Sequence, residues 1–152
     1  MAAAVAVAVL VSGCGSAASF VAALDELDLP DTWERTDREA ITRGDDGCSL
    51  MSGAACPRAV DRYIINEVAR DAHAQATSAI EAVGLEITIS RDTCTHPETA
   101  CRVTGMDDDR LISVVIEVRD DPVTARVTSH RPTDEPPGPT GARGIPVARV
   151  EE

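Results

Sequence analysis

Cysteine is the residue type in this chain with the widest choice of chemistry. The five cysteines are Cys14, Cys48, Cys56, Cys94 and Cys101. A cysteine thiol can be alkylated by a lipid, oxidised to a disulfide or deprotonated to bind a metal. Cys14 stands alone near the N-terminus, whereas the other four form two pairs that are close in sequence. We therefore treat Cys14 separately.

Cys14 follows an unbroken apolar run over residues 2–11. This run is too short to cross a bilayer, which takes about 20 residues, and it suits the apolar core of a secretory signal. The segment Val11-Ser12-Gly13-Cys14 resembles the lipobox of bacterial lipoproteins, in which an apolar residue and two small residues precede a cysteine. The resemblance implies that Cys14 is alkylated with diacylglycerol and becomes the acylated first residue of the mature chain.

A lipid anchor would determine how this protein is attached to the membrane. Two acyl chains anchor a protein stably where one does not, and an acidic body is repelled by acidic lipid. We therefore expect membrane attachment through Cys14 alone, at the extracytoplasmic face of the cell membrane. A secretory signal normally opens with positive charge, whereas the first basic residue here is Arg35. We accordingly expect the natural chain to begin upstream of Met1.

The four remaining cysteines favour two disulfides. An exported chain with an even number of thiols is typical of oxidised proteins, and four cysteines permit three pairings. We favour Cys48–Cys56 and Cys94–Cys101 because each closes a short local loop. Each loop would contribute about 2.5 kcal/mol in the chain-entropy model.

Metal binding is the competing interpretation of these cysteines. Cys94, His96 and Cys101 offer two thiols and an imidazole within one short segment. Zinc sites generally use two to four residues between paired cysteines, together with a second matched pair. The spacing here is wider, so we expect no metal site and interpret His96 as a solvated loop residue. No C-x-x-C redox motif occurs.

The sequence gives little support for acid–base or nucleophilic catalysis. The histidines His73, His96 and His130 share no spacing that would bring them together, and no G-x-S-x-G motif occurs. His73 is expected on the surface of an alanine-rich helix. Glu67 and Asp71 are four residues apart, which is also typical of a solvated helix face. We expect a protein that is not an enzyme and holds no cofactor.

Two acidic clusters raise the question of calcium. Asp107-Asp108-Asp109 and Asp120-Asp121 flank a predicted strand, and nine residues at about 3.3 Å each place them roughly 30 Å apart. Calcium ligands lie at about 2.3–2.6 Å from the ion, so the two clusters cannot form one site. We interpret residues 107–109 as a charged hairpin tip.

Composition excludes further classes of function. The chain of 152 residues carries 26 acidic residues and 14 basic ones, for a formal net charge of −12, and every basic residue is Arg. The absence of Lys excludes Schiff-base chemistry and a P-loop lysine. The acidic balance argues against nucleic acid as a partner. The only aromatic side chains are Phe20, Trp33 and Tyr63.

The clearest expected element is one long helix that begins at Pro57 and ends before Gly84. Proline suits the first helical position, and glycine suits a helix end. Apolar residues recur between them at near-helical spacing, with charges largely opposite. These apolar residues are Val60, Ile64, Val68, Ala72, Ala76, Ile80 and Val83.

The segments on either side of this helix predict a shorter helix and several strands. A short helix is expected up to about Leu27, before Pro30, and a short strand over residues 32–36 with Trp33 turned inward. A ligand cleft lined by Trp33 is the alternative. After Gly84, apolar and polar residues alternate with period two. The expected strands cover residues 85–90, 101–104, 111–118 and 123–128.

We therefore predict an α+β fold, with a four-stranded antiparallel meander packed by one face on one long helix, and a short N-terminal helix. The other face of the sheet is expected to be partly solvated. The expected organisation is a signal peptide over residues 1–13, a lipid-anchored tether over 14–19, the α+β domain over 20–130 and a disordered tail over 131–152. The tail holds five Pro and three Gly with almost no apolar periodicity.

This arrangement resembles that of small uncharacterised actinobacterial lipoproteins. Shared features are the lipobox, a Trp-containing stretch, Cys56-Pro57 before a long helix, and a C-terminal run of strands with a cysteine pair. The all-Arg basic complement fits a GC-rich genome. The resemblance implies a location and a fold, and no reaction.

Two functions follow as expectations. The first is a non-catalytic, lipid-anchored envelope protein that binds a protein or a cell-wall partner. The alternative is a ligand-capture lipoprotein with an apolar pocket between helix and sheet. An exposed patch would favour the first, and a closed pocket with convergent polar groups would favour the second.

Overall fold

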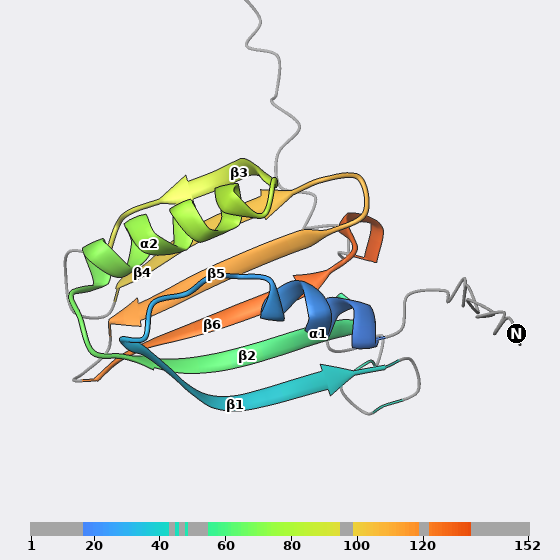
Figure 1. Cartoon of the computed structure of the whole chain (residues 1–152), viewed down its shortest axis with the longest axis horizontal. Coiled ribbons are helices and arrows are strands. Elements are labelled where there is room, and N and C mark those ends of the chain that lie inside the picture. The colour runs from blue at the N-terminus through green and yellow to red at the C-terminus, as the bar shows by residue number, and fades with distance from the viewer. Residues whose placement is uncertain are drawn as a thin grey trace, which may run out of the picture.

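The computed structural model describes residues 17–42, 45, 48, 55–94, 99–118 and 122–134. Two α-helices, six strands and one short 3-10 helix occur in these residues (Figure 1). In chain order they are α1 (Ala17–Asp25), β1 (Trp33–Ile41), β2 (Arg58–Ile65), α2 (Ala69–Ala82), β3 (Glu86–Arg91), β4 (Thr99–Met106), β5 (Leu111–Val118), β6 (Val123–His130) and η2 (Pro132–Asp134).

All six strands form one sheet in the order β1-β2-β6-β5-β4-β3, and every neighbouring pair is antiparallel. The last four strands follow one another as a meander, as the period-two pattern predicts. The hairpin of β1 and β2 adds two more strands along β6. The predicted four-stranded sheet on one long helix is therefore wrong, because the fold has six strands and two short helices.

The first half of the expected long helix is strand β2. Val60 and Ile64 lie four residues apart, which suggested one face of a helix. Four is also a multiple of two, so the same pair lies on one face of a strand. Residues with branched or aromatic side chains, such as Ile65 and Tyr63, favour a strand here. Antiparallel pairing with β1 on one side and β6 on the other then fixes Arg58–Ile65 as extended.

The second half of the expected helix is α2. Val68 precedes it in extended conformation, without a side-chain cap. Gly84 follows the helix at φ +82°, a left-handed conformation that favours glycine. The amide of Leu85 donates to the carbonyl of Ile80 at 3.4 Å, which closes the helix end. The prediction that the helix ends before Gly84 is confirmed, and its predicted start at Pro57 is wrong.

Strand β1 is longer than its sequence pattern suggested. Trp33 is turned inward as predicted, with 5% of its surface exposed. The strand continues to Ile41 through residues that are mostly charged, with a bulge between Arg35 and Asp37. Charges and bulges are common on edge strands, where they discourage pairing with a further strand. Apolar periodicity therefore predicted only the first part of this strand, because the residues that follow are mostly charged.

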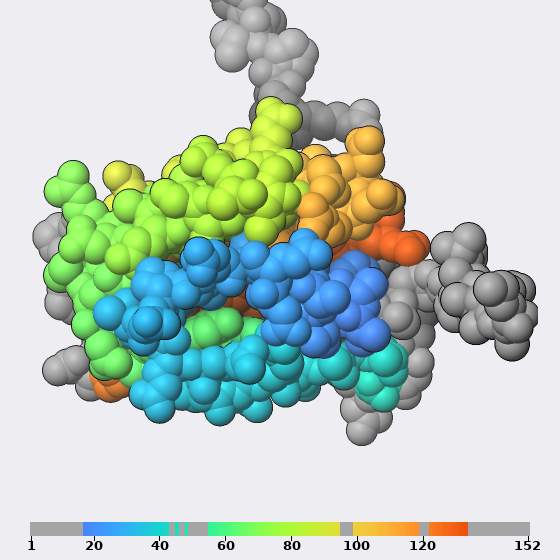
Figure 2. Space-filling model, viewed as in Figure 1, coloured from blue at the N-terminus to red at the C-terminus, as the bar shows by residue number. Residues whose placement is uncertain are grey.

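Both helices lie on the same face of the sheet (Figure 1). Helix α1 contacts β1, β2 and β6, and α2 contacts β3, β4 and β5. We call this the covered face, and we call the opposite side the open face because no described helix lies on it. Figure 2 views the covered face and shows a shallow hollow between the segment that follows α1 and strand β1, with β2 at its floor. Among the described residues, no helix is long and apolar enough to cross a membrane.

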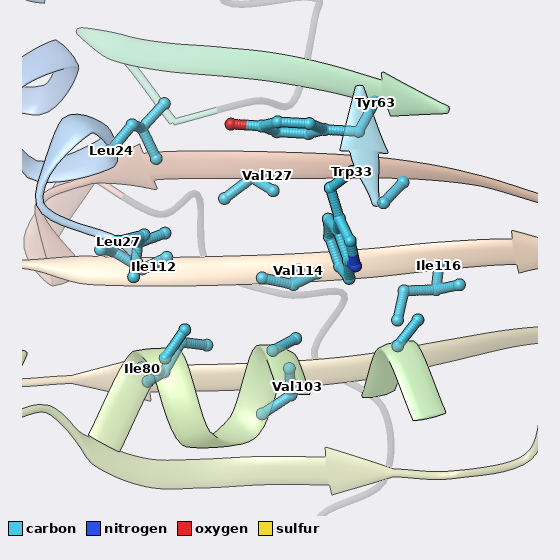
Figure 3. Close-up of a cluster of buried hydrophobic side chains, with 14 of the residues drawn as sticks. Leu24, Leu27, Trp33, Tyr63, Ile80, Val103, Ile112, Val114, Ile116 and Val127 are labelled. Atoms are coloured by element: carbon cyan, nitrogen blue, oxygen red, sulfur yellow. The ribbon is translucent and has the colours of Figure 1, made fainter. Parts of the chain in front are cut away.

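The hydrophobic core fills the space between the helices and the covered face (Figure 3). Val103, Val114 and Ile116 of the central strands are fully buried. Alanines let α2 approach the sheet closely, and a Cβ placed on Gly105 of β4 would collide with the side chain of Ile80. Along α2 the two layers are therefore packed without space for a side chain between them.

Candidate functional site

A buried carboxylate organises the covered face near α1. Asp61 of β2 is fully buried and accepts hydrogen bonds from Arg38 Nε at 2.7 Å and Arg38 Nη2 at 2.6 Å. The hydroxyl of Tyr63 donates to the same carboxylate at 3.2 Å. Arg38 also contacts Asp25 of α1 at 2.7 Å, and Arg35 lies 3.6 Å from both carboxylates. This network joins α1, β1 and β2.

The network changes the acid–base behaviour of two of its members. The hydrogen bond to Asp61 raises the pKa of Arg38 above its ordinary value. Burial, and then the neighbouring Asp61 carboxylate, raise the pKa of Tyr63 to about 12. Asp61 has no exposed surface, and its oxygens already accept hydrogen bonds, so it cannot reach a substrate. The network is structural.

A second polar cluster joins the only Trp to α2. Trp33 Nε1 donates to Glu67 Oε1 at 2.7 Å and contacts Gln75 Oε1 at 3.3 Å, while Gln75 Nε2 donates to Glu67 Oε2 at 2.8 Å. The Trp33 ring also packs edge-on against Tyr63 at 5.8 Å between centroids. Trp33 is therefore a core residue, as favoured over a cleft. Glu67 precedes α2, so its predicted place with Asp71 on one helix face is wrong.

The histidines lie apart on different elements. His73 is buried on α2, and among the described residues its Nε2 has no hydrogen-bond partner. Its predicted position on the helix surface is wrong, because α2 turns it inward together with Ala69 and Ala72. His130 ends β6, with Nδ1 2.7 Å from the carbonyl of Arg131. His96 lies outside the described residues.

Two cysteine pairs lie at disulfide distance, which supports disulfide bonds in this chain. They are Cys48–Cys56 and Cys94–Cys101, with Cα atoms 5.6 Å and 4.9 Å apart. These are the pairs that the spacing favoured. Within the described ranges, no group of three His, Cys, Asp or Glu side chains could hold a metal ion. Cys14 lies outside the described residues.

The acidic cluster at residues 107–109 forms a turn between β4 and β5. Asp107 Oδ1 accepts hydrogen bonds from the amides of Asp109 and Arg110 at 2.9 Å and 2.7 Å. The Arg110 side chain also contacts Asp107 at 3.2 Å and Glu26 of α1 at 2.8 Å. The carboxylate of Asp107 therefore stabilises the turn, as expected for a hairpin tip. Asp120 and Asp121 lie outside the described residues.

The open face carries a feature that sequence reasoning missed. One line of register partners crosses the sheet from β2 through β6, β5 and β4 to β3, and arginine occupies four of its five positions. We call these four side chains the arginine row. In spatial order the positions are Arg62, Arg126, Val115, Arg102 and Arg91. Four strand intervals of about 4.8 Å make the row roughly 19 Å long.

The arginines of the row differ in what surrounds them. Arg62 is already paired, at 2.6 Å with Asp37 and 3.6 Å with Glu39 of β1. Arg91 and Arg126 are exposed, and no other described residue forms an ion pair with either. Of these arginines, only Arg62 is neutralised by described neighbours.

Arg102 is held in place by the hydroxyl groups beside it. Its Nε donates to Ser113 Oγ at 3.2 Å and to Thr104 Oγ1 at 3.3 Å, and these two hydroxyls bond each other at 3.1 Å. Both hydroxyl residues are buried, so their positions are fixed. The bond at Nε orients the guanidinium while its two Nη groups stay available for a ligand.

No known protein family, no curated protein and no solved structure matches this chain.

Sequence reasoning could find the arginines but not the row. Arg102 and Arg126 each alternate with apolar residues in a period-two segment, which marks them as outward-facing, whereas the local patterns around Arg62 and Arg91 carry no such signal. Their alignment depends on the register of strands that are as many as 64 positions apart (126 minus 62). The spacing of residues along the chain carries no such information.

Proposed function

We propose that this chain is a lipid-anchored, non-catalytic envelope protein that binds a cell-wall or protein partner through the open face of its sheet. The arginine row is the observation that carries the proposal. It places positive charge on a face that no described helix covers, in a chain whose net charge is −12. Such a separation of charge favours recognition of a partner on that face.

The covered face supports a binding role rather than catalysis. Its buried polar groups, Asp61 and Glu67, accept hydrogen bonds from Arg38 and Trp33 and so hold the elements together. The polar side chains described on the open face are mainly guanidinium and hydroxyl groups, together with the carboxylates of Glu117 and Glu86. The guanidinium and hydroxyl groups bind anions and offer no activated nucleophile.

The anchor would hold the domain close to the membrane. Gly15 and Ser16 alone separate Cys14 from Ala17, the first residue of α1. Three residue steps reach at most about 10 Å, so a lipid at Cys14 would keep α1 beside the bilayer. Because α1 packs on the covered face, the exposed residues of the open face, such as Arg126 and Thr124, would stay directed away from α1.

The anchor and the binding face can be tested separately. Cys14→Ser is expected to release the chain from the membrane fraction or leave it unprocessed, and a processed variant that still enters the detergent phase would contradict the anchor. A photo-crosslinker at exposed Thr124 on the open face should then be captured by envelope material in intact cells. The same group at exposed Ser78 of α2 is the matched control. Equal capture from both positions, or none from Thr124, would contradict the binding face.

The alternative function, capture of a small molecule between helix and sheet, would depend on the hollow in Figure 2. The aromatic side chains of this region, Trp33 and Tyr63, are only 5% and 8% exposed. The ion pair between Arg38 and Asp25 further ties β1 to α1. These contacts favour the open face over the hollow as the binding site.

A further inference from the structure

We propose that three members of the arginine row, Arg91, Arg102 and Arg126, bind a linear anionic polymer with phosphodiester groups, running across the strands on the open face. This inference rests on the proposed function, because it names the chemistry of the partner that the same face would bind. It is carried by three observations. They are the placement of like charges opposite each other, the fixed orientation of Arg102, and the hydroxyl residues that flank the row.

The first observation is that arginines face each other across strand pairs. Arg62 is the register partner of Arg126, and Arg91 is the register partner of Arg102. Like charges directly opposite each other destabilise a sheet. Asp37 and Glu39 compensate Arg62, whereas no described acidic residue forms an ion pair with the other three arginines of the row. A bound polyanion would remove this repulsion by placing negative charge between the guanidinium groups.

The second observation is the orientation of Arg102. Because Ser113 and Thr104 hold its Nε, the two Nη groups are restricted before any ligand arrives. A restricted guanidinium loses less side-chain entropy on binding than a free one. Arg102 stands between Arg126 and Arg91 in the row, so it would hold the centre of the polymer.

The third observation concerns the row next to the arginines. In that row Ser113 and Thr104 are buried, whereas Thr128 is half-buried and, together with the exposed Thr124, flanks Arg126 on the open face of β6. Hydroxyl groups can bond to phosphate oxygens and to sugar or polyol hydroxyls. These two threonines therefore favour a polymer whose phosphate and hydroxyl groups lie beside Arg126.

Among the described residues, no acidic side chain forms an ion pair with Arg91, Arg102 or Arg126. Glu117 of β5 lies on the open face, one alternation from Val115, and Glu86 lies at the start of β3. The acids of α1 and of the turn at Asp107 lie on or beside the covered side, so the sheet separates them from the row.

Titration of the full chain with poly(glycerol phosphate) tests the inference. Three arginines of the row form no ion pair with a described residue, so the logarithm of the affinity should fall with the logarithm of the salt concentration with a slope of about 2. Arg91→Gln, Arg102→Gln and Arg126→Gln should each weaken binding about five- to tenfold and lower the slope by about 0.7. Glu117→Gln should strengthen binding.

Two arginine variants serve as matched controls. Arg62→Gln removes a guanidinium that Asp37 and Glu39 already neutralise, and Arg70→Gln removes an exposed one from α2 on the covered side. Both should change the affinity less than twofold. An effect of Arg70→Gln equal to that of Arg126→Gln would overturn the inference, since net charge alone would then explain binding.

Two further ligands separate the phosphodiester polymer from other anions. Polyglutamate of matched charge should bind more weakly than poly(glycerol phosphate), and tighter binding would overturn the inference in favour of an acidic protein partner. The Cys14→Ser chain should show no arginine-dependent preference for phosphatidylglycerol over phosphatidylcholine vesicles, and a preference without polymer binding would overturn it in favour of a membrane. If Thr124 still crosslinks while the polymer fails to bind, the proposed function stands and this inference falls.

Discussion

Arg126 of β6 lies directly opposite Arg62 of β2, and both side chains stand on the face of the sheet that no described helix covers. Arg62 has Asp37 and Glu39 as partners on its other side, whereas no other described residue forms an ion pair with Arg126. The pair therefore joins a guanidinium that has ion-pair partners to one that has none among the described residues. The repulsion that remains between the two side chains can be relieved by changing Arg126 without breaking a described ion pair.

Relief of that repulsion gives the first prediction. Arg126→Gln is expected to raise the free energy of unfolding by about 0.2–1 kcal/mol, because a like-charge cross-strand pair is removed. Urea denaturation monitored by circular dichroism measures the change. Arg70→Gln, on exposed helix surface, should leave the midpoint unchanged. A loss of stability in Arg126→Gln would show that this guanidinium makes a stabilising contact in the folded chain.

The buried ion pair gives the second prediction. Asp61→Ala leaves the guanidinium of Arg38 without its bidentate partner in a mostly buried position. Removal of one partner from such a pair costs about 3–5 kcal/mol. The exposed pair of Arg62 and Asp37 is the comparison, and Asp37→Ala should cost less than about 1 kcal/mol. Equal costs in the two variants by urea denaturation would contradict a structural role for the Asp61 network.

Tyr63 gives the third prediction, on pH. Its pKa is raised from 10.0 to about 12 when folded, by burial first and by the Asp61 carboxylate second. The unfolded chain therefore ionises Tyr63 at lower pH than the folded chain. Its contribution to stability is complete below pH 10 and is lost as pH rises towards 12, by about 2–3 kcal/mol in total.

This ionisation can be observed directly because Tyr63 is the only tyrosine. Tyrosinate absorbance at alkaline pH should show a midpoint near 12 in the folded chain and near 10 in urea. Tyr63→Phe should abolish the step in both conditions. A midpoint near 10 in the folded chain would mean that the ring is not buried beside Asp61.

Close packing of α2 gives the fourth prediction. Gly105→Ala places a methyl group against Ile80 and 3.1 Å from Leu85 Cβ, so α2 must move away from β4. Overpacking of this kind costs about 1–3 kcal/mol. Ile80→Val in the same chain should recover part of the loss, whereas on its own it should destabilise. Thermal or urea denaturation of the two single variants and the double variant measures these changes. If the stability changes of the single variants simply add in the double variant, residue 105 and the Ile80 side chain are not in direct contact.

The second disulfide gives the fifth prediction. Replacement of Cys94 and Cys101 by Ala opens a loop with a sequence separation of 7, which should lower the free energy of unfolding by about 2–3 kcal/mol. Peptide mapping without reduction should first show Cys94 joined to Cys101. Peptides that join either cysteine to Cys48 or Cys56 would contradict the pairing and remove the basis of the stability prediction.

Several elements of the fold could be predicted from local pattern. The alternation after Gly84 identified the last four strands, and they pair in the predicted antiparallel order. Such strands need only short connections, so their topology follows from their sequence order. The inward position of Trp33 and the helix end at Gly84 were also predictable, since each depends on a residue type with few alternatives.

Strand β2 shows where local pattern is insufficient. The apolar residues Val60 and Ile64 satisfy a helical period and a strand period equally well. Pairing with β1 and β6 decides between them, because it satisfies backbone hydrogen bonds on both sides of Arg58–Ile65. Neither partner strand belongs to the local sequence around β2. The local sequence therefore does not determine whether this segment is a helix or a strand.

The sequence by itself determined the charge of the chain, its lack of Lys, its few aromatic residues, and the faces to which most strand residues point. Only the tertiary structure decided that Asp61 is buried against Arg38 and that four arginines from four strands form one row. The physical reason is that the direction of a side chain follows from the local period of the backbone. Which side chains become neighbours follows instead from strand order and register, and these are set by hydrogen bonds and packing between distant segments.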